Sequence, residues 1–183
     1  MKTDKITETI EIPEGVQVSH ENNLFVIKGP KGELKRRFFN PRINIEIKNN
    51  EIILSCGQKP TKREKKMIYT YKAHLVNMMK GIRTGHIYKL RIFYTHFPMN
   101  VSVREKVFEV KNFIGENTPR KLVMPEGINV EVKGNEVIVE GIDKEKTAQA
   151  AADIETLTKR PGFDKRIFQD GIYIYHKDGK DLI

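Results

Sequence analysis

Residues 13–29 read PEGVQVSHENNLFVIKG, and residues 125–141 read PEGINVEVKGNEVIVEG. The two stretches align without a gap and share the opening Pro-Glu-Gly, one valine, one asparagine and the closing glycine. Each pattern predicts one β-hairpin, because β-branched residues alternate with polar ones on both sides of an Asn-Asn or Gly-Asn turn. The recurrence indicates a duplicated domain, and it predicts that the first stretch superposes on the second.

The length of the repeat unit decides the kind of duplication. A unit of about 100 residues is longer than a solenoid repeat, which has about 20–50 residues, and it can bury a modest core. A chain of 183 residues has room for two such units. We therefore expect an α+β protein of two tandem duplicated domains, residues 1–82 and 83–183, each a small antiparallel β-sheet packed with one α-helix.

Two segments change from the period of a strand to that of a helix. The first begins with the capping-box spacing of Thr61 and Glu64, and Gly81 is expected to end it. It is expected to bury an apolar stripe made of Ile68, Tyr71, Leu75 and Met78. The second is expected to begin at Asp143 and to bury Ala150, Ile154 and Leu157.

Several classes of protein are disfavoured by what the chain contains. Cys56 is the only cysteine, so an internal disulfide or a cysteine-based metal cage is impossible. The first residues lack the apolar core of a secretory signal, and no apolar run approaches the roughly 20 residues that cross a bilayer. The five histidines form no H-x-x-x-H pair, and no nucleophile elbow or phosphate-loop motif is present. We expect a cytoplasmic protein with no enzymatic activity, no cofactor, no metal, no membrane contact and no small-molecule substrate.

The charge of the chain favours a polyanionic partner. Thirty-three Lys and Arg residues stand against 24 Asp and Glu, which gives +9 and a pI near 9.5. Residues 1–82 carry 16 basic and 9 acidic side chains, whereas residues 83–183 carry 17 and 15. A basic surface without a specific partner is the alternative.

The basic clusters give the candidate site. One lies in a Pro-Gly loop beside Phe163 and Phe168, where cations could grip phosphate and rings could stack on bases. The predicted RNA-binding residues are Arg120, Lys121, Lys159, Arg160, Lys165 and Arg166. A secondary basic surface comprises Lys35, Arg36, Arg37, Lys62, Arg63, Lys65 and Lys66. Two alternatives stay open: the loop cations could only neutralise Asp164 and Asp170, and the helical cluster could be a solvated face.

Five motifs carry a resemblance to a known family. They are GPKGEL at 29–34, HLVNMMKGI at 74–82, YKLRIFYTHFPMNV at 88–101, NFIGE at 112–116 and RIFQDGIY at 166–173. With these motifs in this order, the chain resembles the large-subunit ribosomal protein family called L six in the universal naming and L nine in the older eukaryotic naming, in its archaeal–eukaryotic form. The resemblance covers essentially the whole chain.

The resemblance implies two similar α+β domains and a place in the large ribosomal subunit, near the stalk base and the sarcin–ricin region where translation factors dock. It implies a structural role supporting translation, with large-subunit ribosomal RNA and neighbouring ribosomal proteins as partners, as a monomer within the ribosome. It also implies that the second domain makes most of the RNA contact, although net charge favours the first. The alternatives are a protein-interaction adaptor outside the ribosome, whose binding would depend less on salt, and a small nucleic-acid enzyme.

Overall fold

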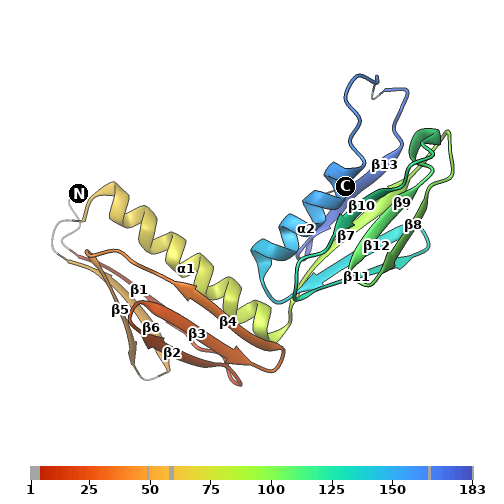
Figure 1. Ribbon diagram of the computed structural model, residues 1–183. Helices are drawn as coiled ribbons and strands as arrows, with labels where there is room; N and C mark the ends of the chain where they lie inside the picture. The colour runs from red at the N-terminus through yellow and green to blue at the C-terminus, as the bar shows by residue number, and fades with distance from the viewer. Residues whose placement is uncertain (1–4, 49, 58–59, 165, 183) are drawn as a thin grey trace. The chain divides into compact units, whose positions relative to one another are not determined.

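The computed structural model describes residues 5–48, 50–57, 60–164 and 166–182. The chain divides into two compact units, Met1–Gly85 and His86–Ile183. Each unit contains one long α-helix and two antiparallel sheets (Figure 1). The predicted fold class, a duplicated α+β protein, is confirmed. No helix in the described part of the chain is long and apolar enough to cross a membrane.

The first unit holds two three-stranded sheets. One has the order β1 (Ile6–Glu11), β6 (Glu51–Cys56), β5 (Ile43–Lys48), and the other has the order β2 (Gln17–Glu21), β3 (Leu24–Gly29), β4 (Gly32–Arg37). Helix α1 (Lys62–Arg83) follows β6 and packs against both sheets. Phe25, Ile52, Leu54 and Leu75 lie fully buried between these layers.

The second unit holds a three-stranded and a five-stranded sheet. The smaller one has the order β10 (Arg120–Val123), β9 (Val107–Lys111), β8 (Asn100–Arg104). The larger one has the order β11 (Ile128–Lys133), β12 (Glu136–Gly141), β7 (His86–Phe93), β13 (Gly171–Lys177), β14 (Lys180–Asp181). Helix α2 (Lys144–Leu157) packs on the larger sheet, and the 3-10 helix η1 (Phe113–Gly115) precedes β10.

The order of the strands corrects the alignment of the duplication. In both units the chain forms one strand, then a three-stranded meander, then a hairpin and then a helix. These elements are β1, β2–β4, β5–β6 and α1 in the first unit. They are β7, β8–β10, β11–β12 and α2 in the second unit. In each unit the hairpin pairs with the first strand, so β1-β6-β5 corresponds to β7-β12-β11. The expectation that residues 13–29 superpose on residues 125–141 is therefore wrong, because β2–β3 corresponds to β8–β9.

The two stretches share local structure without sharing a place in the fold. Val18 lies opposite Ile27 and Val130 lies opposite Val139, which is the same register in both hairpins. A hairpin's register depends on its own turn and alternation, whereas its place in a sheet depends on distant partners. The corresponding stretches are INIEIKNNEII at 43–53 and INVEVKGNEVI at 128–138, identical at seven of eleven positions. That match was the available signal for the correct alignment.

Helix α1 starts as predicted and ends later than predicted. The amide and hydroxyl of Thr61 both donate to Glu64 Oε2, each at 2.5 Å. The predicted apolar stripe is buried along its length. Gly81 does not end the helix, since it is buried within α1, and the left-handed glycine is Gly85, with φ +84°. Its amide donates to the carbonyl of Gly81 and closes the helix.

Helix α2 also begins as predicted. Asp143 caps it by accepting a hydrogen bond from the amide of Glu145 at 3.0 Å. Ala150 and Ile154 are buried against the sheet, while Leu157 is partly buried. Alanines on the inner face let the helix lie close to the strands, which in turn fixes where its C-terminal end meets the loops of this unit.

Two glycines mark the close approach of strand and helix. A Cβ at Gly29 would overlap Ile82 of α1, and a Cβ at Gly141 would overlap the hydroxyl of Thr147 in α2. We expect Gly29→Ala and Gly141→Ala each to lower the free energy of unfolding by about 1–3 kcal/mol, because a packed core resists added volume. Urea denaturation measures the effect. Gly57→Ala is the control, since a Cβ there meets nothing within 4 Å; equal effects at Gly29 and Gly57 would contradict the prediction.

Candidate nucleic-acid interface

The loop that joins α2 to β13 is anchored by a buried carboxylate. Asp170 is 4% exposed and accepts hydrogen bonds from the amide and hydroxyl of Thr95, at 2.5 and 2.8 Å, and from the amide of His96 at 3.4 Å. Burial raises the pKa of Asp170, but these hydrogen bonds outweigh burial and hold the pKa below its ordinary value. The end of the loop is thereby fixed to the segment that follows β7.

Aromatic rings pack inside the same loop. Phe168 stacks on His96 with ring centroids 4.9 Å apart, and Phe163 meets Phe168 edge-on at the same distance. The guanidinium of Arg160 lies 4.4 Å from the centre of the Phe163 ring. Phe168 is therefore an internal support of the loop, whereas Phe163 remains exposed.

Arg120 holds the unit together and is not a free cation. It donates twice to Glu116, at 2.7 and 2.8 Å, and it donates to the carbonyl of Leu157 at 2.6 Å. Its guanidinium also lies 4.4 Å from the Phe113 ring centre. The predicted role of Arg120 in gripping RNA thus competes with a structural one: it links the loop before β10 to the C-terminal end of α2.

Arg160 completes the same cluster. Its Nη1 lies 3.3 Å from Glu116 Oε1, and its side chain is 34% exposed. The hydrogen bond from Arg120, together with the charges of both arginines, lowers the pKa of Glu116. Arg160 is thus partly buried and engaged by a carboxylate, which limits its predicted role in gripping RNA. Glu116 was not among the predicted site residues, although it stands four residues before Arg120.

The remaining predicted cations of the second unit lie at the surface. Lys159 is exposed, and Arg166, with a side chain 90% exposed, pairs with Asp164 at 2.9 Å. Lys121 is exposed and pairs with Glu109 at 3.5 Å. Exposed pairs of this kind contribute little to stability, so a phosphate can replace the carboxylate at small cost. Lys165 lies outside the described residues.

Exposed apolar side chains occur in the loop that joins α2 to β13 and in the strands that adjoin it. Two of them, Phe163 and Ile167, come from the loop itself, Tyr173 comes from β13, and Phe93, Tyr94 and Phe97 come from the end of β7 and the turn after it. A hollow of about 260 Å³ lies at the C-terminal end of α2. It is lined chiefly by Phe113, Ile114, Phe163, Phe168 and Tyr173, and its charged lining residues are Lys159, Arg160, Glu155 and Asp170. Rings beside cations suit contact with unstacked bases.

The secondary basic surface of the first unit falls into two parts. On β4, Lys35 pairs with Glu33 at 2.9 Å, and Arg36 lies 3.3 Å from the ring nitrogen of His74. Arg37 is exposed at the end of the same strand. On α1, Lys62, Arg63, Lys65 and Lys66 are all exposed. The fold thus brings the predicted cations of the first unit to one strand and one helix.

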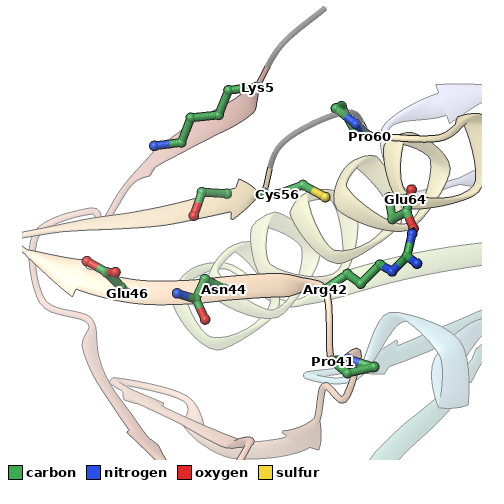
Figure 2. A pocket seen from close by; sticks show the side chains of 10 residues that line it. Lys5, Pro41, Arg42, Asn44, Glu46, Cys56, Pro60 and Glu64 are labelled. Carbon is green, nitrogen blue, oxygen red and sulfur yellow. The ribbon is translucent and has the colours of Figure 1, made fainter.

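The first unit also contains the larger hollow, of about 680 Å³, beside the start of α1 (Figure 2). Arg42 reaches across to Glu64 at 2.9 Å, and the thiol of Cys56 lies close by without a histidine among the lining residues. Hydrogen bonds from Thr61, together with Arg42, lower the pKa of Glu64 to about 2. This carboxylate serves the helix cap, and the described residues hold no cluster of three His, Cys, Asp or Glu side chains that could bind a metal.

Comparison with known proteins identifies the family. The family model described as Ribosomal protein L6 matches residues 12–85 and 97–171. The chain belongs to the ribosomal protein L6 family. Its two matched segments fall one in each unit, apart from the first strand of each. The resemblance predicted from the sequence motifs is confirmed, and the family is one of structural proteins without enzymatic activity.

Several archaeal relatives are similar over nearly their whole length. A protein of Methanosarcina mazei is 45% identical over 94% of this chain and 98% of its own. A protein of Methanobrevibacter smithii is 44% identical over 94% of this chain and 97% of its own. A protein of Nanoarchaeum equitans is 39% identical over 100% of this chain and 99% of its own. Each is named large ribosomal subunit protein uL6.

Proposed function

We propose that the chain is a structural component of the large ribosomal subunit, in the cytoplasm, where it binds large-subunit ribosomal RNA and neighbouring ribosomal proteins and supports translation. The full-length similarity to relatives named large ribosomal subunit protein uL6 carries the proposal. The net charge of +9 supports it, because ribosomal RNA is a polyanion. One copy acts within each subunit, near the stalk base and the factor-binding region.

The main RNA surface of this proposal is the loop after α2 in the second unit. Lys159 and Arg166 supply exposed positive charge, and Phe163 and Tyr173 supply exposed rings within the same region. Asp170 and Arg120 give the loop a fixed shape, so it can present these groups without a large ordering cost on binding. The second unit can therefore bind RNA despite its near-neutral charge, because the cations are concentrated in one place.

The test removes only the exposed cations. We expect Lys159→Gln/Arg166→Gln to keep the fold by circular dichroism and to weaken binding to purified large-subunit ribosomal RNA. The slope of log K against log salt should become less steep by about two units, roughly one for each lost phosphate contact. Arg120 and Arg160 stay unchanged because replacing them would disturb Glu116.

The matched control removes equal charge elsewhere in the second unit. Lys106→Gln/Lys133→Gln alters two exposed lysines that pair with Glu126 and Glu131. This control should bind as the wild type does and should co-sediment with the large subunit when tagged and expressed. Equal losses in both double variants would remove the loop from its assigned role, and a wild-type chain that stays in the free-protein fraction would overturn the ribosomal function.

A further inference from the structure

We propose that Lys62, Arg63, Lys65 and Lys66, at the start of α1, form a second RNA-binding surface that holds the phosphate backbone of a double-stranded RNA segment. These four residues are called the α1 cluster below. The inference rests on the proposed ribosomal function and assigns a role to the more basic first unit. The inference is based on the exposure of these four cations and on the lack of a described carboxylate beside them.

Among the described residues, the four cations of the α1 cluster have no acidic partner, a property that they share with the candidates Arg37 and Lys159. All four are exposed, and no described carboxylate lies within ion-pair distance of any of them. By contrast, Lys121, Arg160 and Arg166 each meet a carboxylate. Uncompensated cations attract a polyanion without first having to release a neighbour, and the α1 cluster gathers four of them within one short stretch of helix.

Helix α1 offers no exposed acidic group to balance the α1 cluster. Its single acidic residue, Glu64, is 7% exposed and is held by Thr61 and Arg42. The nearest acid of the adjoining hollow, Glu46, pairs with Lys48. Both carboxylates are therefore engaged within the fold, and the solvent side of the helix start remains positive.

The stability of the helix does not explain these cations. Lys62 stands three and four residues before Lys65 and Lys66, a spacing at which like charges repel. A helix start already carries partial positive charge, so lysine and arginine are unfavourable there. The four cations therefore destabilise the start of the helix in two ways. A negatively charged ligand that binds them would explain why they are present.

The rest of the exposed face fits a nucleic-acid duplex. Tyr69 and Val76 are exposed, and Thr70 and Ala73 lie between them. Glu8 of β1 reaches Tyr69 and is paired with Lys72, so the centre of this face carries no net charge. Arg83 adds an exposed cation at the far end of α1. The shallow minor groove of RNA presents sugars between two phosphate strands, which matches a centre without net charge and with cations beyond it.

A charge-matched pair of variants tests the proposal in the full-length chain. Lys62→Gln/Lys65→Gln/Lys66→Gln is compared with Lys28→Gln/Lys48→Gln/Lys133→Gln, which removes three exposed lysines that pair with Glu33, Glu46 and Glu131. For a short perfectly paired RNA duplex, we expect the first variant to bind at least about tenfold more weakly and its salt slope to fall by about three units. Its melting temperature should equal or exceed that of the wild type, because the repulsion is gone. Equal effects on RNA binding in the two variants would overturn the proposal.

A second measurement uses the wild-type chain and so does not depend on any variant folding. Lysine acetylation followed by mass spectrometry compares the free chain with the chain bound to the RNA duplex or mixed with polyglutamate. Protection of Lys62, Lys65 and Lys66 by RNA, with Lys28 and Lys48 unprotected, supports the proposal. Protection by polyglutamate alone would overturn it and indicate an acidic protein partner.

The loop variant separates this inference from the function on which it rests. If Lys159→Gln/Arg166→Gln loses affinity for ribosomal RNA and the α1-cluster variant keeps it, the second surface is refuted and the ribosomal function stands. If neither variant differs from the wild type, both assigned RNA surfaces are refuted, and co-sedimentation of the wild-type chain with the large subunit still decides the ribosomal function. We expect both variants to lose affinity for ribosomal RNA. The two losses in binding free energy should add when the substitutions are combined.

Discussion

Replacing Arg120 by Met is expected to lower the free energy of unfolding by about 3 kcal/mol, because charged hydrogen bonds at a partly buried site are lost together. The guanidinium satisfies both oxygens of Glu116 and the carbonyl of Leu157, and it lies against the Phe113 ring. Its loss would leave Glu116 paired with Arg160 alone. Urea denaturation measures the change, and hydrogen exchange should show faster opening at the C-terminal end of α2.

Two further variants make the prediction specific to the geometry of Arg120. Arg120→Lys keeps the charge without the two-pronged donor, so it should recover less than half of the lost stability. Lys121→Met alters the adjacent residue, whose exposed pair with Glu109 should contribute no more than about 1 kcal/mol. If Arg120→Met cost no more than Lys121→Met, Arg120 would be a surface cation after all and would return to the RNA-binding set.

Asp170 is the second residue whose replacement should have a large effect. We expect Asp170→Ala to lower the free energy of unfolding by about 3 kcal/mol, since the Thr95 and His96 amides would lose a buried charged acceptor. Asp170→Asn keeps one acceptor oxygen and should cost about half as much. Binding of the variants to ribosomal RNA should also weaken, because the loop that carries Lys159 and Arg166 loses its anchor.

The pH dependence of stability gives an independent check on Asp170. Its pKa is lower in the folded chain than its ordinary value, so its contribution is present above the unfolded pKa of about 3.9. That contribution is lost as the pH falls through the folded pKa. The difference in stability between the wild type and Asp170→Asn should therefore narrow below about pH 4.

Asp153→Asn, which alters a hydrogen bond with Gln149, is the control and should change stability by no more than about 0.5 kcal/mol. A difference that stays constant at low pH would contradict the role given to the Asp170 charge.

Local patterns in the sequence determined the elements of this L6 family member. Alternating β-branched residues predicted the hairpins, the Thr61–Glu64 spacing predicted the start of α1, and Asp143 predicted the start of α2. Each of these features depends on residues within a few positions of one another, so it can be recognised from the sequence alone. The five motifs identified the family because they extend the same local information along the whole chain.

The tertiary structure decided between two alignments of the duplication that the sequence allows, one relating residues 13–29 and the other residues 43–53 to the second unit. Residues 13–29 and 125–141 form the same kind of hairpin, yet β3 pairs with β4 whereas β12 pairs with β7. Pairing of that second kind joins strands that are distant in sequence, and a hairpin's own pattern does not encode its neighbour in the sheet. Similar local chemistry at two unequal places in the fold produced the wrong alignment.

The tertiary structure also decided what each basic residue is free to do. In the sequence, Arg120 and Lys62 are both members of basic clusters, and each contributes one positive charge to the composition. In the fold, Arg120 is enclosed by Glu116, Phe113 and the end of α2, while Lys62 stands exposed without an acidic neighbour among the described residues. The sequence determines how much positive charge the chain carries, but only packing determines what encloses each cation. Contacts such as those of Arg120 with the Leu157 carbonyl and of Arg160 with Glu116 join residues far apart in the chain.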